Sequence, residues 1–550
     1  MRSQEFGDGR MPMEPTGYAD SFARDNLPDE DDWPDLIFNR PGLQYPPRLN
    51  AAVELLDKTV AAGHGDRVAV YSSEKTLTYA ELNAAANRLA HVLVDDLGLV
   101  SGNRVLLHGG NSADLMIAWH AVLKAGGIAV ATMPMLRETE LTKIVRKAEV
   151  RLALVDPRFA EPAQESQAAG SGLERVAEFG PHSTLEEMAA GKPATFEACD
   201  AAADDVALLA FTSGTTGEPK ACAHFHRSIL AMADTFARHC LDPQPGDVYA
   251  GTPPFAFTFG LGAFVVFPAR FGAAVALPDR PGFEALCETI ERFGVTHTFT
   301  APTGYRAMIG LAERFDLCSL KGGVSAGEHL PEATWRAWNE TTGVELIDGI
   351  GATEMIHIFI SAPAGEIRPG ATGKPVPGYE ARLIDDAGAP LAVGETGRLA
   401  VRGPTGCLYL ADERQKSYVQ DGWNVTGDVF RTDEDGYFWY VSRSDDMIVS
   451  SGYNIAAIEV EQALLKHDAV AECAVAGRPC AERGAIVSAH VVLKDPARAG
   501  DALARELQDF VKATIAPYKY PRAVAFVDDL PKTQTGKLQR FRLENRDESA

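Results

Sequence analysis

The chain has 550 residues, with 52 Lys and Arg against 76 Asp and Glu, and a formal net charge of −24. A chain of this length predicts several domains, and 46% hydrophobic with 23% charged residues is typical of a globular protein, which excludes intrinsic disorder. The acidic excess argues against nucleic acid or an anionic membrane as the main partner, because either would repel this surface. An anionic ligand must therefore be bound by a local group of amides and cations.

Eight cysteines are scattered along the chain without a C-x-x-C pair. This pattern indicates reduced thiols and predicts a cytoplasmic protein. No run approaches about 18 consecutive apolar residues, so we expect no membrane span. Residues 1–17 are polar and lack the apolar core of a secretion signal, so we expect a disordered N-terminus or a tag there.

The first third of the chain alternates strands with helices. Strand-like runs at residues 67–71, 104–108, 128–131 and 152–155 separate helical segments, and Thr78 and Glu81 have the spacing of a capping box. Residues 156–205 are typical of surface helix and loop, and residues 206–211 of a buried strand. Units of this size predict an α/β fold with a largely parallel, doubly wound sheet.

The pattern changes near residues 442–447, where a smaller unit with both helix and strand character begins. Its size of about 105 residues is normal for a separate domain. We therefore expect a domain boundary at this point.

Residues 212–220 read TSGTTGEPK and directly follow the predicted buried strand. Glycines, hydroxyls and a lysine at this spacing can surround a polyphosphate with amides, hydroxyls and one cation. An ordinary Ser/Thr/Gly turn is the alternative, and a matched run of this length disfavours it. In this run the chain resembles the adenylate-forming superfamily, which includes acyl- and aryl-CoA ligases, adenylation domains and luciferases.

The other motifs of that superfamily follow in order: SAGE at residues 325–328, DGIGATE at 348–354, TGD at 426–428, and PKTQTGKLQR at 531–540. The resemblance implies that Lys537, Thr212, Lys220 and Glu354 are catalytic and that Glu354 binds Mg²⁺. One carboxylate is enough for this metal, since Mg²⁺ usually keeps waters and shares substrate phosphates. The nucleotide-binding residues that the resemblance implies are Ser213, Gly214, Thr215, Thr216, Gly217, Ser325, Ala326, Gly327, Glu328, Asp348, Gly349, Ile350, Thr353, Asp428 and Arg443.

The resemblance also implies the domain organisation. We expect a large AMP-binding domain of doubly wound sheets plus a small barrel-like subdomain at residues 18–443, a hinge at 444–446, and a small mobile C-terminal α+β domain at 447–550. Asp445 is then the hinge residue. By composition alone, the segment with Lys537 is a basic solvated tail, and only the combined motifs favour a catalytic role.

Two aromatic-rich segments are expected to bind the acid substrate. The resemblance is strongest to benzoate-CoA and 2-aminobenzoate-CoA ligases, in DGIGATEMIHIF, YKYPR, DDLPKTQTGKLQRF and FARDNLP. Benzoate enzymes have a small apolar residue and a tyrosine where this chain has Thr258 and Phe259, and either Thr258 or His357 can address an ortho substituent. The substrate residues implied are Phe257, Thr258, Phe259, Phe267, Gly351, His357 and Ile358.

The expected function is an ATP-dependent aryl-CoA ligase, with 2-aminobenzoate (anthranilate) as the favoured acid and AMP and pyrophosphate as products. Ser451, Gly452, Tyr453 and Lys519 are the residues implied for coenzyme A. Benzoate as the acid, a stand-alone aryl-acid adenylating enzyme that loads a carrier protein, and a nucleotide sensor without turnover stay as alternatives. The intact set of catalytic residues argues against the sensor. The oligomeric state stays open, with a homodimer as one option.

Overall fold

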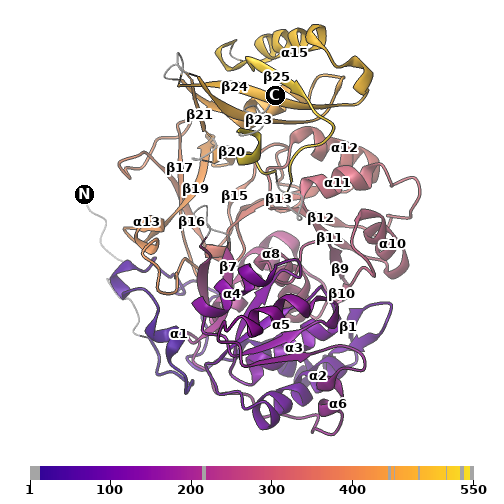
Figure 1. The fold of residues 1–550 in the computed structure, drawn as a ribbon, viewed down its shortest axis with the longest axis vertical. Helices are drawn as coiled ribbons and strands as arrows, with labels where there is room; N and C mark the ends of the chain where they lie inside the picture. The colour runs from indigo at the N-terminus through magenta and orange to yellow at the C-terminus, as the bar shows by residue number, and fades with distance from the viewer. Residues whose placement is uncertain are drawn as a thin grey trace.

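The computed structural model describes residues 13–212, 218–443, 447–450, 453–480, 484–515, 517–532 and 538–544. It has an α/β fold in which three sheets form a large N-terminal part and a fourth sheet forms a small C-terminal part (Figure 1). The predicted fold class is confirmed.

A six-stranded sheet contains most of the strands predicted in the first third of the chain. Its first five strands are parallel, and the sixth pairs antiparallel with its neighbour. In spatial order the strands are β6 (Arg175–Glu178), β5 (Leu152–Val155), β3 (Arg104–His108), β4 (Ile128–Thr132), β7 (Val206–Thr212) and β8 (Lys220–Phe225). The helices of this region are α2 (Tyr79–His91), α3 (Ala113–Lys124), α4 (Glu138–Lys147), α5 (Glu161–Ala168), α6 (Thr184–Ala190) and α7 (His226–Met232).

A nine-stranded mixed sheet forms the second layer. In spatial order its strands are β15 (Lys374–Pro375), β14 (Ile358–Ser361), β13 (Leu346–Gly351), β12 (Gly322–Ser325), β11 (His297–Thr300), β9 (Val248–Gly251), β10 (Ala274–Ala276), β1 (Val68–Tyr71) and β2 (Thr76–Thr78). The helices are α8 (Thr258–Leu261), α9 (Phe267–Phe271), α10 (Phe283–Phe293), α11 (Pro302–Ile309) and α12 (Glu332–Thr342), with the π-helix η7 (Gly262–Val266) between α8 and α9. Strands β9 to β13 are parallel, so their carboxyl ends meet at one edge.

An antiparallel five-stranded sheet completes the large part. It contains β16 (Glu380–Ile384), β17 (Thr396–Arg402), β19 (Trp423–Thr432), β18 (Val419–Gln420) and β20 (Phe438–Arg443), with the short helix α13 (Gln415–Tyr418). In Figure 1 it lies to the left of the nine-stranded sheet and below the small C-terminal part.

The described residues of the small C-terminal part form a five-stranded sheet and three α-helices. The strands are β22 (Tyr453–Ala456), β21 (Met447–Ser450), β24 (Gly484–Leu493), β23 (Val470–Cys480) and β25 (Ala523–Phe526), and the helices are α14 (Ala457–Leu464), α15 (Asp501–Thr514) and α16 (Phe541–Glu544). Gln462 of α14 hydrogen-bonds His329 of the large part, Nε2 to Nε2, at 2.7 Å. His329 also stacks on Tyr440 of β20.

Short irregular helices join these elements. The π-helices are η2 (Val53–Asp57), η3 (Val60–His64), η4 (Val92–Asp96), η6 (Ala233–Leu241) and η7, and the 3₁₀ helices are η1 (Glu30–Asp32), η5 (Pro157–Phe159), η8 (Thr353–Met355), η9 (Pro496–Arg498) and η10 (Pro517–Lys519).

The predicted capping box is confirmed: Thr78 caps α2 together with Glu81. The structure adds a second cap, since Ser112 accepts from the amide of Leu115 at the start of α3. The segment at residues 156–205 was expected to be helix and loop only, which is wrong, because it also contributes edge strand β6. That strand is partly exposed and has no alternating apolar pattern, so its sequence carries no strand signal.

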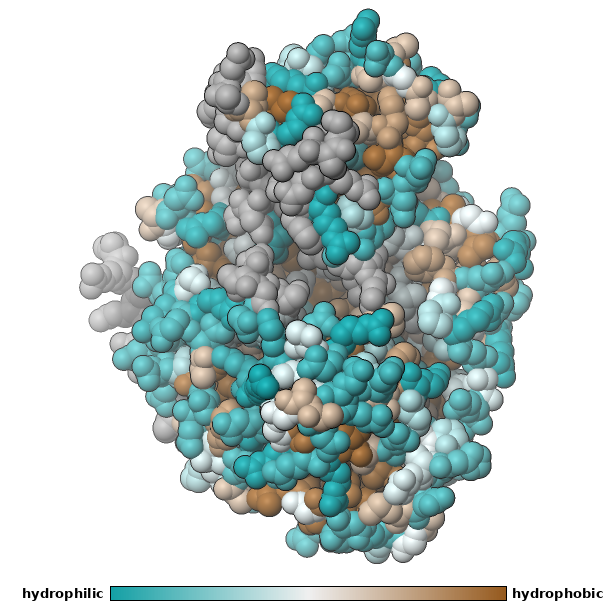
Figure 2. Space-filling view, in the orientation of Figure 1, coloured by the Kyte–Doolittle hydropathy of each residue, from teal (hydrophilic) through white to brown (hydrophobic). Residues whose placement is uncertain are grey.

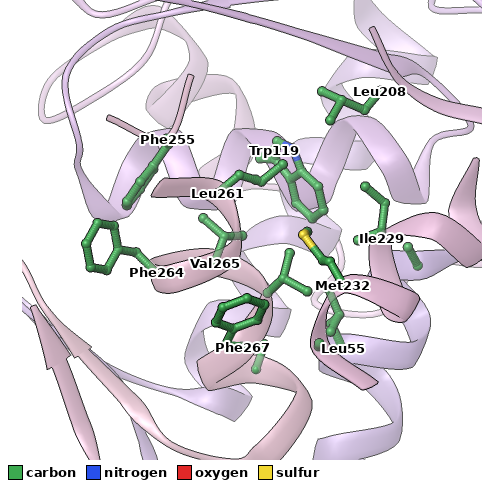
Figure 3. Packing of buried hydrophobic residues seen from close by; sticks show 14 of the residues in the cluster. Leu55, Trp119, Leu208, Ile229, Met232, Phe255, Leu261, Phe264, Val265 and Phe267 are labelled. Carbon is green, nitrogen blue, oxygen red and sulfur yellow. The ribbon is translucent and has the colours of Figure 1, made fainter. Parts of the chain in front are cut away.

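Buried hydrophobic residues of both large sheets form one continuous cluster, in which Trp119 of α3 meets residues of α7 and η7 (Figure 3). On the face shown in Figure 2, hydrophilic side chains cover most of the described surface. All eight cysteines are free thiols. None of the helices in the described ranges is long and apolar enough to cross a bilayer.

A segment before and including α1 (Phe22–Asp25) packs against residues from far along the chain. The Gly17 amide donates to Asp205 Oδ2 at 2.8 Å, and the Tyr18 hydroxyl lies 2.7 Å from His226 Nε2. Asp20 forms an ion pair with Arg104 at the start of β3. The N-terminal segment is therefore part of the folded unit.

Candidate active site

The hairpin of β7 and β8 presents the residues of the phosphate-loop motif. Thr212 ends β7 and Lys220 begins β8, and the two residues pair directly across the antiparallel ladder. This arrangement places a hydroxyl and an ammonium group on either side of the connecting turn. The predicted nucleotide residues within that turn lie outside the described residues: Ser213, Gly214, Thr215, Thr216 and Gly217.

Lys220, Tyr409 and Glu354 form a connected polar cluster. Lys220 Nζ donates to the Tyr409 hydroxyl at 2.7 Å, and that hydroxyl donates to Glu354 Oε1 at 2.5 Å. Lys220 Nζ is also 3.6 Å from Glu354 Oε1 and 4.7 Å from the centre of the Tyr409 ring. Burial and the nearby Glu354 carboxylate raise the pKa of Tyr409, so this side chain stays a neutral donor.

The strand β8 also fixes the turn that carries Glu354. His224 Nε2 lies 2.8 Å from the carbonyl oxygen of Thr353, the first residue of η8. A carbonyl only accepts, so Nε2 of His224 carries the proton. Burial lowers the pKa of His224 to about 4, which keeps the ring neutral at physiological pH. The six-stranded sheet thus positions a residue of the nine-stranded layer.

The two other predicted nucleotide turns lie side by side. Strands β12 and β13 are parallel, and their register pairs Ser325 with Asp348. The SAGE turn and the DGIGATE turn therefore leave the same edge of the sheet. Burial raises the pKa of Asp348, and its Oδ1 has no hydrogen-bond partner among the described residues.

Asp428 and Arg443 form a cross-strand pair between β19 and β20. Arg443 Nη1 lies 3.5 Å from Asp428 Oδ1. The arginine Nη2 also packs on the backbone of Gly427, where an added Cβ would lie 2.5 Å away. The structure therefore brings these two predicted residues together.

The predicted acid segments meet around His357. The imidazole lies 4.7 Å from the ring of Phe267, 5.8 Å from Phe259 and 5.4 Å from Phe236, measured between ring centres. Neither ring nitrogen makes a hydrogen bond of good geometry with the described residues. Burial lowers the pKa of His357 to about 3, although a backbone group of Phe259 opposes this shift.

Two glycines allow this close packing. A Cβ at Gly262 would lie 2.5 Å from His357 Cδ2, and one at Gly351 would lie 2.9 Å from the His357 backbone. Thr258 and Ile358 are buried, whereas Phe257 is 37% exposed at the start of α8. The structure thus gathers most predicted acid residues around one neutral imidazole.

Several predicted residues lie outside the described residues: Lys537, Asp445, Ser451 and Gly452. Tyr453 is described only as the first residue of β22. Lys519 donates to both carboxylate oxygens of Glu459 in α14, at 2.6 and 2.5 Å. The charge of Lys519 is therefore already paired with that of Glu459 in this arrangement.

The residues present fit a magnesium ion. Glu354 Oε1 accepts from Tyr409, and no bond from Oε2 to another described residue is present. No group of three or more His, Cys, Asp or Glu in the described ranges could hold a metal with protein ligands alone. Mg²⁺ usually binds to one or two carboxylates plus substrate phosphates and water, which agrees with this single carboxylate.

Sequence reasoning missed Tyr409 and His224. Both are defined by contacts across 55 to 189 residues of chain, and neither has a local motif. The sequence contained one signal for His224: it lies four residues after Lys220 on the same strand, β8.

Comparison with known proteins agrees with this geometry. A family model described as AMP-binding enzyme matches residues 57–408, and one described as AMP-binding enzyme C-terminal domain matches residues 459–537. A benzoate–CoA ligase of Thauera aromatica is 36% identical over 518 residues, which cover 92% of this chain and 97% of that protein. A 3-hydroxybenzoate–CoA ligase of Aromatoleum sp. strain CIB is 34% identical over 508 residues, with 90% and 96% covered.

The solved structures give the same result. A crystal structure of an anthranilate CoA ligase in complex with anthranoyl-AMP superposes with a TM-score of 0.86 and 35% identity, covering 92% of this chain and 98% of that one. The chain belongs to the AMP-binding enzyme family. It is an AMP-forming acid–thiol ligase, as its motifs predicted.

Proposed function

We propose that this chain is an ATP-dependent aryl-CoA ligase with 2-aminobenzoate as its best acid. In the first step a carboxylate oxygen attacks the α-phosphorus of ATP, and the bond to pyrophosphate breaks as the aryl-adenylate forms. In the second step the thiol of coenzyme A attacks the acyl carbon, loses its proton, and displaces AMP. The products are aryl-CoA, AMP and pyrophosphate.

The polar cluster supports the first step. Lys220 and Thr212 bind phosphate oxygens at the β7–β8 hairpin, and Glu354 holds Mg²⁺, which supplies positive charge to the phosphates when bound. Asp428 accepts from the ribose hydroxyls, with Arg443 beside it. Catalysis of this kind depends on positioning and charge stabilisation, so no protein nucleophile is needed.

Two further residues belong to the small C-terminal part. Lys537 approaches the reacting carboxylate and α-phosphate during adenylate formation, and Asp445 is the hinge between two domain arrangements. Ser451, Gly452 and Tyr453 line the path of coenzyme A in the second arrangement. These roles rest on the motif resemblance.

The observation that carries the choice of acid is the environment of His357. Its neutral imidazole is buried among Phe236, Phe259 and Phe267, and neither nitrogen makes a well-formed hydrogen bond to a residue that the structure describes. Flat apolar walls suit a planar ring, and a buried unpaired nitrogen is satisfied by a polar substituent on that ring. The similarity to benzoate-, 3-hydroxybenzoate- and anthranilate-CoA ligases supports an aromatic acid.

The test is to measure CoA-dependent AMP release with 2-aminobenzoate, benzoate, 3-hydroxybenzoate and octanoate. We expect 2-aminobenzoate to have the highest kcat/KM and octanoate the lowest. A site that hydrogen-bonds a substituent discriminates strongly against the analogue that lacks it. His357→Phe or Thr258→Val should therefore narrow the gap between 2-aminobenzoate and benzoate.

The outcomes separate the alternatives. If benzoate has the highest kcat/KM, the chain is still an aryl-CoA ligase, but the choice of an ortho-amino acid is refuted. If octanoate has the highest kcat/KM, the aromatic pocket is refuted. Pyrophosphate release without CoA-dependent AMP release would favour an enzyme that loads a carrier protein. The eight free thiols support a reducing compartment such as the cytoplasm.

A further inference from the structure

The side chain of Asn111 bonds the backbone of a loop more than 140 residues away. Asn111 Nδ2 donates to the carbonyl oxygen of Pro253 at 2.9 Å, and Asn111 Oδ1 accepts from the amide of Phe255 at 2.8 Å. Asn111 lies between β3 and α3, at the carboxyl end of a strand of the six-stranded sheet. The loop it bonds follows β9 of the nine-stranded sheet. One amide side chain therefore links the two large sheets.

Within the loop itself, the amide of Phe257 donates to the carbonyl oxygen of Pro254 at 3.0 Å, and other parts of the loop backbone need partners from outside. Residues 253 and 254 are both prolines and have no N–H group, and Phe255 is buried, so its amide needs a partner. On the other side, Gly260 lies against the loop, since a Cβ there would overlap the carbonyl of Pro254. The loop is therefore held between Asn111 and the backbone of α8.

The same loop leads into the segment that faces the proposed acid site. Phe255 packs on Phe264 of η7, with ring centres 6.1 Å apart (Figure 3). Thr258 begins α8, and Phe259 follows with its ring beside His357. A shift of the loop would therefore move the wall that contacts the acid.

The helix that follows Asn111 packs into the same region. Trp119 of α3 belongs to the buried cluster that also contains Leu261 and Val265 (Figure 3). Apolar packing between α3 and η7 sets the distance between the layers, but it is not directional. The two hydrogen bonds of Asn111 supply the direction, because a side-chain amide bonds a donor and an acceptor only in one orientation.

We infer that Asn111 is a positioning residue for the acid substrate: it holds the loop at residues 253–257 and thereby sets the position of Thr258 and Phe259. This inference rests on the proposed acid site, and it does not depend on which acid the enzyme prefers. Among the described residues, no hydrogen bond joins Asn111 to Lys220 or Glu354 of the phosphate site.

The experiment compares Asn111→Ala, Asn111→Asp and the control Asn103→Ala with wild type. Asn103 also forms a hydrogen bond with each end of its side-chain amide: Nδ2 donates to Asp20 Oδ2 at 2.7 Å, and Oδ1 accepts from the backbone amide of Val100 at 3.2 Å. It lies at the opposite end of β3 from Asn111. Asn111→Asp keeps an acceptor for Phe255 and loses the donor to Pro253. Steady-state KM for acid and for ATP, and kcat, are measured with whichever carboxylate the wild type uses best.

We expect both Asn111 variants to lose roughly 10- to 100-fold in kcat/KM for the acid, since displacement of the substrate by about 1 Å has effects of this size. KM for ATP should stay within about twofold, and the ratio of kcat/KM between 2-aminobenzoate and benzoate should move toward one. Asn103→Ala should change neither the acid KM nor this ratio, although its melting temperature falls.

Three results would overturn the inference: an unchanged acid KM in both Asn111 variants, an equal rise in KM for ATP, or the same acid defect in Asn103→Ala. If Asn111→Ala is not recovered as folded protein, the nearly isosteric Asn111→Asp decides the question. A wild type that prefers a non-aromatic acid refutes the proposed function alone, because the Asn111 comparison is then made with that acid.

Discussion

The hydroxyl group of Tyr409 lies between the two oppositely charged residues of the site, Lys220 and Glu354. It accepts from one and donates to the other, so it fixes which carboxylate oxygen of Glu354 is occupied. The second oxygen is then directed away from Tyr409. A hydrogen bond to a charged group contributes about 1.5–3 kcal/mol, which is enough to hold one rotamer of the glutamate.

Tyr409→Phe should therefore impair adenylate formation. We expect pyrophosphate release to lose roughly 10- to 100-fold in kcat/KM, the equivalent of that hydrogen bond, and to require more Mg²⁺ for half-maximal rate. Thioester formation from supplied aryl-adenylate should stay within about twofold, because the phosphates have already reacted.

Tyr379→Phe is the matched control for this prediction. Tyr379 is also a buried tyrosine, and its hydroxyl lies 2.8 Å from Thr405 Oγ1. Equal effects of the two variants on pyrophosphate release and on Mg²⁺ dependence would contradict the role of the Tyr409 hydroxyl.

The sequence pointed to candidate residues that lie in motifs, and it did not point to residues that are defined by contacts across the fold. Lys220 and Glu354 were predicted as catalytic, and the structure brings them together in one polar cluster. Thr212, also predicted, pairs with Lys220 across the β7–β8 ladder. Tyr409 could not be predicted, because it meets Lys220 across 189 residues. A contact at such separation depends on how three sheets pack, and no local spacing encodes it.

At the scale of elements, the helix η7 lies directly on the imidazole of His357. Its first residue, Gly262, has no side chain, and the imidazole fills the space where a Cβ would be. Phe267 at the start of α9 closes the same space, since its Cζ would lie 3.0 Å from that Cβ. The orientation of His357 is therefore set by helix packing.

Gly262→Ala should displace the imidazole. The added methyl group would lie 2.5 Å from Cδ2 and 2.6 Å from Nε2 of His357, and overpacking of this kind costs about 1–3 kcal/mol of stability. We expect KM for the acid to rise roughly 10-fold, with KM for ATP nearly unchanged. Gly246→Ala is the control, since nothing lies within 4 Å of its Cβ position; similar acid KM values for both variants would contradict the prediction.

Elements with strong local signals were predictable from the sequence. The strand β3 was predicted with its exact observed bounds, and α2 begins at its predicted cap. The edge strand β6 and the hairpin of β21 and β22 were not predicted, because pairing with neighbours and not apolar periodicity defines them. The π-helical turns, such as η4 at the end of α2, also lack a sequence pattern.

At the scale of the whole molecule, burial strongly lowers the pKa of six histidines in the described part of the chain. The ordinary pKa of a histidine is near 6.5. Burial lowers it to about 4 in four of them, His108, His120, His224 and His329. It lowers it to about 3 in the other two, His226 and His357. An unfolded chain binds these protons more readily than the folded chain does.

Stability should therefore fall as pH drops below about 6.5. Each depressed histidine contributes up to about 1.4 kcal/mol per pH unit between its unfolded and folded pKa values. Asp348 acts in the opposite direction, because burial raises the pKa of its carboxyl group. The melting temperature should change little from pH 7.5 to 6.5 and should fall clearly from 6.5 to 5.5.

Calorimetric scans at one scan rate check this prediction. His226→Asn should flatten the fall below pH 6.5, since asparagine can still accept from the amide of Ala51 as His226 Nδ1 does but does not titrate. A melting temperature that is constant from pH 6.5 to 5.5 would contradict the prediction.

The docking of the N-terminal segment has a consequence for biosynthesis. Tyr18 meets His226, which is synthesised 208 residues later. At about 5–20 residues per second, His226 follows Tyr18 out of the ribosome roughly 10–40 s later. During this interval the segment has no native surface to bind, and closing so long a loop has a large entropic cost. Until His226 has been synthesised, the segment around Tyr18 therefore stays accessible to chaperones and proteases.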